Sequence, residues 1–101
     1  MNQPSLKSRL KVYVRQLLAD DDNAIRHFVQ VNDIDDLLDA SSDNEEEFVK
    51  EQVNILTDQP VWNDIMWLVY QYTHSVNEQR RLKLLAKIFI LGEMSRTNEH
   101  C

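Results

Sequence analysis

Carboxylates are the most concentrated reactive groups in this 101-residue chain, because twelve of its 17 acidic residues fall within residues 20–51. Such runs can hold calcium when oxygen ligands alternate, a glycine stands sixth and a glutamate twelfth. A loop that begins at Asp33 has Leu38 and Asn44 at those two positions. A loop that begins at Asp39 fails in the same way, so the sequence does not predict a calcium-binding loop.

The acidic residues also lie where helices are expected to begin. Short runs at 20–22, 33–36 and 45–47 each precede or open an expected helix, where carboxylates accept backbone N–H groups and favour the helix dipole. We favour this capping role. The alternative is that the run mimics nucleic-acid phosphates and blocks a DNA-binding protein. In a protein-binding role, the acidic run would attract a basic partner and raise its association rate. The carboxylates that we expect to do so are Asp33, Asp35, Asp36 and Asp39.

The three histidines and the single cysteine form no ligand or catalytic spacing. His27, His74 and His100 share no helix at a spacing of four residues, and Cys101 pairs with none of them. Nucleophilic catalysis needs an activated Ser or Cys beside an oxyanion hole, which commonly lies on a glycine-containing turn. The chain has one glycine. We therefore expect a protein that is not an enzyme and that uses no metal and no cofactor.

Two large aromatic residues, Trp67 and Tyr70, lie on the otherwise polar face of an expected helix. Each would bury about 150–250 Å² when covered. With Met66 at the edge and His74 one turn further on, they resemble a binding hot spot, where truncation commonly costs about 2 kcal/mol or more. The alternative is that neighbouring helices cover both rings and make them core. The sequence alone leaves both interpretations open.

The scarcity of turn-forming residues predicts the fold class. One glycine and two prolines, with abundant Leu, Asp, Glu, Lys and Gln, favour an all-α protein with short connections. We expect a compact bundle of five to six helices in one domain, 1–101, with residues 1–4 and 95–101 loose. No stretch approaches the roughly 18 apolar residues of a membrane-spanning helix, and residues 1–9 lack a signal-peptide core. A cytoplasmic location without membrane contact is therefore expected.

Residues 60–91 are predicted to form the central hairpin of the bundle. Its first helix begins at Pro60, where a missing N–H is harmless. An S-x-x-E capping box at residues 75–78 begins the second helix, with Asn77 as the alternative start. Gly92 is expected to end that helix in a left-handed conformation.

The apolar residues of the hairpin indicate which faces are buried. In the first helix they share one face, and they are Val61, Trp62, Ile65, Leu68, Val69, Tyr72 and Val76. In the second helix they cover more than half of the circumference, so we expect several neighbours to bury it. Ile90 and Met94 extend this apolar surface and suggest a homodimer seam through the last helix.

The first half of the chain is predicted to contain the remaining helices. Ser5 caps a helix that reaches about Ala19, the acidic residues 20–22 cap a second and Asp33 caps a short third. A second S-x-x-E pair at residues 42–45 begins the fourth. A basic stripe on the first helix is expected to be solvated and attracted to the acidic middle, with an anion contact as the alternative. This stripe consists of Lys7, Lys11 and Arg15.

The function that the sequence favours is a small acidic regulator that occupies the surface of another protein, as an inhibitor, adaptor or immunity-type protein. Trp67, Tyr70 and His74 would make the contact, and the partner would offer a basic surface. Direct nucleic-acid binding is not expected, because the net charge is −6. The alternatives are a nucleic-acid mimic that inhibits a DNA-binding protein and a structural subunit of an obligate helical oligomer.

Overall fold

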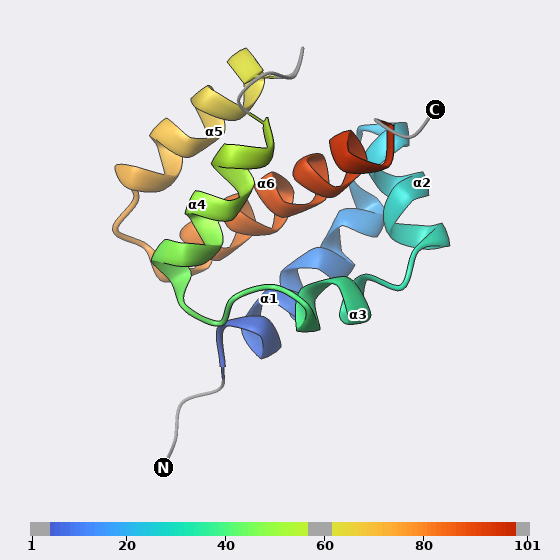
Figure 1. The fold of residues 1–101 in the computed structure, drawn as a ribbon, viewed down its shortest axis with the longest axis horizontal. Coiled ribbons are helices and arrows are strands. Elements are labelled where there is room, and N and C mark those ends of the chain that lie inside the picture. Colours follow the sequence, from blue (N-terminus) through green and yellow to red (C-terminus); the bar gives the residue numbers. More distant parts are fainter. Residues whose placement is uncertain (1–4, 57–61, 99–101) are drawn as a thin grey trace.

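A computed structural model describes residues 5–56 and 62–98, and within these ranges it contains six α-helices, one 3₁₀ turn and no strand. The elements are α1 (Leu6–Gln16), η1 (Leu17–Ala19), α2 (Asn23–Val31), α3 (Ile34–Asp39), α4 (Glu45–Leu56), α5 (Trp62–Thr73) and α6 (Glu78–Asn98). They form a compact bundle (Figure 1). The prediction of an all-α bundle of five to six helices is confirmed. The predicted helix start at Pro60 lies outside the described residues.

The last helix, α6, is the element around which the others are arranged. It packs against α1, α2, α4 and α5, and it runs through the middle of the bundle (Figure 1). Because apolar residues cover more than half of its circumference, the sequence predicts that several neighbours bury this helix. Its buried apolar residues do lie on more than one side of it. They are Leu82, Leu85, Ala86, Ile88, Phe89 and Ile90.

The predicted end of this helix at Gly92 is wrong. Gly92 is buried, has no positive φ angle, and α6 continues past it to Asn98. Residues 95–98, expected to be loose, are therefore helical. A glycine inside a helix costs about 1 kcal/mol relative to alanine. Burial of the turns on both sides offsets that cost, so tertiary packing overrides the local stop signal.

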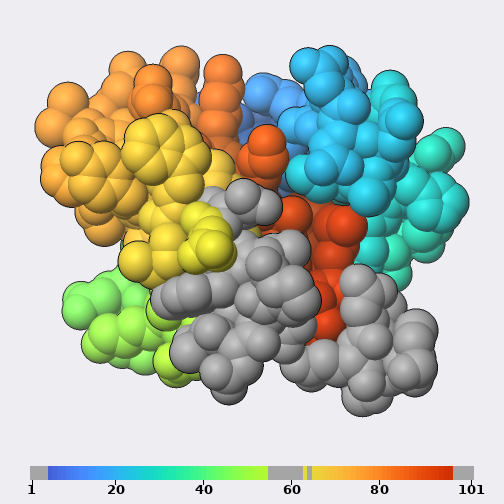
Figure 2. Space-filling view, turned by 90° about the horizontal axis from the view of Figure 1, so that it is seen from above, coloured from blue at the N-terminus to red at the C-terminus, as the bar shows by residue number. Residues whose placement is uncertain are grey.

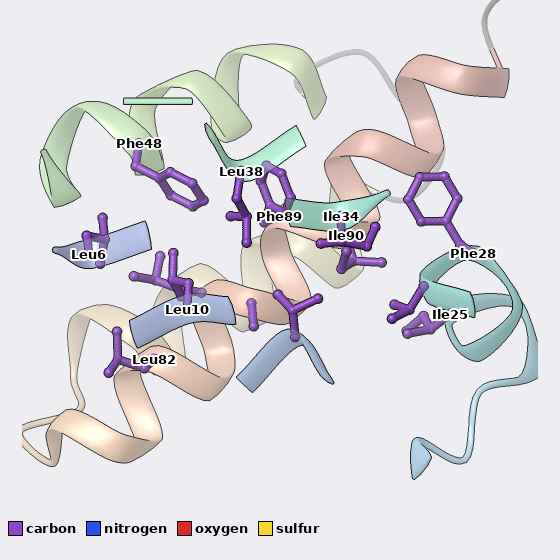
Figure 3. Close-up of a cluster of buried hydrophobic side chains, with 14 residues drawn as sticks. Leu6, Leu10, Ile25, Phe28, Ile34, Leu38, Phe48, Leu82, Phe89 and Ile90 are labelled. Carbon is purple, nitrogen blue, oxygen red and sulfur yellow. The ribbon is translucent and has the colours of Figure 1, made fainter. Parts of the chain in front are cut away.

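The hydrophobic core lies where α1, α2, α3 and α4 meet α6 (Figure 3). Phe48 of α4 and Phe89 of α6 stack with their ring centroids 5.4 Å apart and an interplanar angle of 29°. Leu10 of α1 and Leu38 of α3 are completely buried beside them. Since these side chains come from four helices, the core joins segments that are far apart in the sequence.

Three of the predicted helix caps are confirmed. The Ser5 hydroxyl accepts the N–H of Ser8, the Asp22 side chain accepts two N–H groups at the start of α2, and the Asp33 side chain accepts the N–H of Asp36. Each side chain satisfies a backbone donor that the first turn of a helix leaves unpaired. The acidic residues Asp22 and Asp33 thus have the capping role that we favoured.

The two predicted S-x-x-E capping boxes are displaced. Asn44 caps α4 through a 3.0 Å bond from the Glu47 N–H, while the Ser42 hydroxyl accepts the N–H of Asn44. Asn77 caps α6 through a 3.0 Å bond from the Arg80 N–H, which was the alternative start. Asparagine accepts such bonds as well as serine does, so the S-x-x-E pattern alone was not decisive.

The basic stripe of α1 faces the acidic helix α3, as expected. Lys11 forms an ion pair of 3.1 Å with Asp39, and Arg15 one of 3.2 Å with Asp35. Lys7 donates from Nζ to the carbonyl oxygen of Asp39 over 2.9 Å. Exposed pairs of this kind contribute at most about 1 kcal/mol each. They mainly align α3 along α1.

Three apolar residues in and after the hairpin lie elsewhere than expected. Val76 was assigned to the core face, but it is 98% exposed in the connection between α5 and α6. Ile90 is completely buried inside the chain, and Met94 packs against the same core. Ile90 and Met94 therefore do not form an exposed surface on which a second copy of the chain could pack. Homodimerisation stays a prediction, but these two residues no longer support it.

Replacing Ile90 by alanine is expected to lower the free energy of unfolding by about 2–5 kcal/mol, because a buried side chain is removed from a filled core. Urea unfolding followed by circular dichroism measures the change. Val12→Ala on the exposed face of α1 is the control and should change stability by less than about 0.5 kcal/mol. A stability loss that depends on protein concentration would instead place Ile90 in a subunit interface.

Candidate functional site

The candidate site is a row of three rings on the outer face of α5, which we call the aromatic ladder: Trp67, Tyr70 and His74. Trp67 and Tyr70 stack with their centroids 5.7 Å apart and an interplanar angle of 9°. The rings of Tyr70 and His74 follow at 4.2 Å and 32°. Spacings of three and four residues bring side chains together on one helix face, which is why the ladder forms.

The ladder is exposed to solvent. Trp67 is 62% exposed, Tyr70 54% and the neighbouring Met66 46%. Figure 2 shows α5, in yellow to gold, at the surface of this face of the molecule. The interpretation that both rings are core is therefore wrong. The core face of α5 is the opposite one, where Ile65 is completely buried and Tyr72 packs against the core.

The C-terminal end of α5 holds the third ring in place. Nδ1 of His74 lies 2.9 Å from the carbonyl oxygen of Tyr70, and the Thr73 hydroxyl donates to the same oxygen over 2.9 Å. A carbonyl only accepts, so Nδ1 carries the proton in this contact. The bond orients the imidazole over the Tyr70 ring. The three rings are therefore pre-arranged before any partner arrives.

A polar cluster beneath the ladder joins α4, α5 and α6, and the sequence did not predict it. Glu45 accepts a 2.6 Å bond from Arg81 Nη2 and a second from the Tyr72 hydroxyl on the same carboxylate oxygen. The Arg81 guanidinium also lies 5.9 Å from the centre of the Tyr72 ring. In the sequence Glu45 was explained as part of a capping box, and only the tertiary structure brings these three residues together.

The pKa values of this cluster reflect its partial burial. Burial tends to raise the pKa of Glu45, but hydrogen bonds from Tyr72 and Arg81, together with the charges of Arg81 and Arg9, hold that pKa below its ordinary value. Burial raises the pKa of Tyr72 to about 12, and the bond to Glu45 acts in the same direction. Tyr72 thus stays protonated across the neutral range, and its hydroxyl donates a hydrogen bond to Glu45.

The acidic residues predicted to attract a partner lie away from the ladder. α3 lies at the lower centre-right of the bundle and α5 at its upper left (Figure 1). Asp35 and Asp39 form ion pairs with α1, and Asp33 caps α3. The nearby charge of Asp33 and a hydrogen bond with it raise the pKa of Asp36. The structure therefore brings together the predicted aromatic contact residues, but not the predicted acidic residues with them.

The described residues also bear on two other kinds of site, a metal site and a membrane-spanning helix. No three His, Cys, Asp or Glu side chains there are grouped so that they could hold a metal ion. In the same ranges, no helix has both the length and the apolar character needed to cross a bilayer. His27 is exposed on α2. Neither a protein-family model nor a curated protein nor a solved structure matches the chain.

Glu45→Gln is expected to remove a pH-dependent part of the stability. Because the folded-state pKa of Glu45 lies below its ordinary value of 4.5, its stabilisation is complete above about pH 4.5. It is lost as the pH falls through the folded-state pKa. At pH 7 the variant should be less stable by roughly 0.5–1.5 kcal/mol, since the carboxylate is half-buried and solvent screens it.

Urea unfolding of both proteins at a series of pH values between 7 and about 3 tests this expectation. The difference in free energy should shrink as the pH falls below 4.5. Glu46→Gln is the matched control, because Glu46 is an exposed neighbour that pairs only with Lys50. Equal behaviour of the two variants, or a difference independent of pH, would contradict the role assigned to Glu45.

Proposed function

We propose that the protein is a small regulator that binds another protein, as an inhibitor, adaptor or immunity-type protein, and that the aromatic ladder is the contact surface. The observation that carries this proposal is the exposed stack of Trp67, Tyr70 and His74. Scattered surface apolar residues are common and need no explanation, whereas large rings gathered on one helix face are typical of interaction sites.

The physical chemistry of the ladder suits a hot spot. Tryptophan and tyrosine offer large contact areas with only two rotatable side-chain angles each, so little conformational entropy is lost on binding. Stacking and the bond from His74 to the Tyr70 carbonyl restrain the rings further. Exposed Asn63 and half-buried Gln71 flank the rings with polar groups, which resembles the polar rim of an interface.

The chemistry of the rings favours a partner with a basic surface. A guanidinium or ammonium group over a tryptophan face gains roughly 0.5–2 kcal/mol, depending on how far it is desolvated. The net charge of −6 attracts such a partner from a distance and raises the association rate. Cytoplasmic location, absence of catalysis and the basic surface of the partner stay predictions from the sequence.

The nucleic-acid mimic is the weaker candidate. A mimic needs an array of unpaired carboxylates, but Asp35 and Asp39 pair with Arg15 and Lys11, and Glu45 pairs with Arg81. These intramolecular pairs neutralise part of the acidic run. The structural-subunit alternative also loses support, because Ile90 and Met94 belong to the core of the chain itself.

Trp67→Ala is expected to abolish capture of the partner while leaving the fold intact. The immobilised protein captures binders from an extract of its source cells, and these are identified by mass spectrometry. The captured partner should lose at least about 2 kcal/mol of binding free energy in a titration with the variant. Since Trp67 is exposed, the free energy of unfolding of the variant in urea should differ from that of the original protein by less than about 0.5 kcal/mol.

Two control variants make the result specific to the ladder. Val31→Ala replaces an equally exposed apolar residue on α2 and should leave binding unchanged. Neutralising Asp33 and Asp36 should slow association without abolishing binding. If the acidic variant loses the partner and Trp67→Ala retains it, the ladder is not the contact surface and mimicry becomes the better proposal.

A further inference from the structure

A second surface of different chemistry lies between the N-terminal half of α6 and the end of α1 with η1. It is a groove of about 370 Å³, and none of the ladder residues lines it. We call it the cationic groove, because Arg80, Lys83 and Lys87 of α6 line it. Figure 2 shows the start of α6 in orange and the end of α1 with η1 in blue on the two sides of this region.

These three cations form no ion pair within the described parts of the chain, and Asp20 is the one carboxylate among the groove residues described. Most other basic residues have a carboxylate partner there: Arg9, Lys11, Arg15, Lys50, Arg81 and Arg96. In contrast, Arg80 donates only to the neutral amide oxygen of Gln71, over 3.3 Å, and no carboxylate of residues 5–56 or 62–98 forms an ion pair with Lys83 or Lys87. A protein with a net charge of −6 thus keeps a local concentration of positive charge.

The placement of these three cations along α6 does not stabilise the fold. Arg80, Lys83 and Lys87 follow one another at spacings of three and four residues, where like charges repel across a helix face. Arg80 also stands in the first turn of α6, where the helix dipole disfavours a cation. An anionic ligand in the groove would relieve both effects, because it would supply the missing counter-charge.

The lining of the groove narrows the class of ligand. Tyr13, Leu17 and Leu84 are half-buried there and give it an apolar floor beneath the cations. Arg80 and Lys87 are separated by seven residues of helix, which corresponds to about 10 Å. This length matches three to four residues of extended peptide with spaced carboxylates better than one compact anion.

Two observations disfavour a phosphate group. Phosphate sites typically use several backbone N–H groups at a glycine-rich loop or a helix N-terminus, whereas none of the described residues that line the groove is a glycine and only Arg80 stands in the first turn of an α-helix. Asp20 also lines the groove, and its carboxylate would repel a dianion placed beside it. A peptide can avoid Asp20 by placing a neutral or basic residue there.

We propose that the cationic groove binds an acidic peptide segment of a partner protein, with carboxylates on Arg80, Lys83 and Lys87 and an apolar side chain on the floor formed by Leu17 and Leu84. This site is separate from the aromatic ladder and does not rest on its role. A partner that uses both surfaces would offer a basic or aromatic contact to the ladder and an acidic segment to the groove.

The test is a titration of the isotope-labelled protein, followed by amide chemical shifts, with three probes. The first probe is the blocked peptide EELEELEE, the second is QQLQQLQQ and the third is tripolyphosphate. The first peptide should shift amides of α1, η1 and the N-terminal half of α6 that lie around the groove. The second should bind at least about fivefold more weakly, because it lacks the charges.

Lys83→Gln combined with Lys87→Gln should weaken binding of the acidic peptide by about fivefold, as expected for two exposed ion pairs. Lys50→Gln on α4 is the matched control and should leave the affinity unchanged. Both variants change exposed or half-buried side chains, and an unaltered amide spectrum of the rest of the chain confirms that they fold.

Several results would overturn the proposal. These are absence of shifts with the acidic peptide at millimolar concentration, shifts on another face, and equal binding of the glutamine peptide. Tighter binding of tripolyphosphate at the same amides would make this a phosphate site instead. Self-association that the double lysine variant abolishes would mean that a second copy of the chain fills the groove. The pull-down with Trp67→Ala is unaffected by any of these results.

Discussion

Burial of α6 on most of its circumference is the constraint on which the rest of the structure depends. A helix with so wide an apolar girth has to be covered by several neighbours, and α1, α2, α4 and α5 each bury one side of it. The Phe48–Phe89 stack lies where α4 packs against α6. Because each neighbour uses one face for this purpose, its other face stays at the surface, and that is how α5 comes to present the aromatic ladder.

Polar interactions determine how the covering helices are oriented. The cluster of Glu45, Tyr72 and Arg81 ties α4, α5 and α6 together at a half-buried position, where hydrogen bonds and charges are screened less than at the surface. Ion pairs between α1 and α3 align the shortest helix of the bundle. The acidic middle of the chain therefore serves the fold through caps and ion pairs, and part of its charge is neutralised.

The ladder and the cationic groove are neighbours along the α5–α6 edge, although they differ in chemistry. Gln71 follows the ladder residue Tyr70 on α5 and accepts the bond from Arg80, which lines the groove. A single partner could therefore reach both surfaces. Contact with both would combine an aromatic anchor with charge recognition, and two contacts joined in one partner raise the affinity through effective concentration.

The sequence by itself determined the features that depend on near neighbours: the all-α class, the helix starts at Ser5, Asp22 and Asp33, and the gathering of aromatic residues on one face of α5. These follow from periodicity and from side chains that reach backbone groups a few residues away. Tertiary structure alone decided that Gly92 stays helical and that Trp67 is exposed. Both outcomes depend on which helices cover α5 and α6, and that is set by core packing between segments distant in the chain, which no local pattern records.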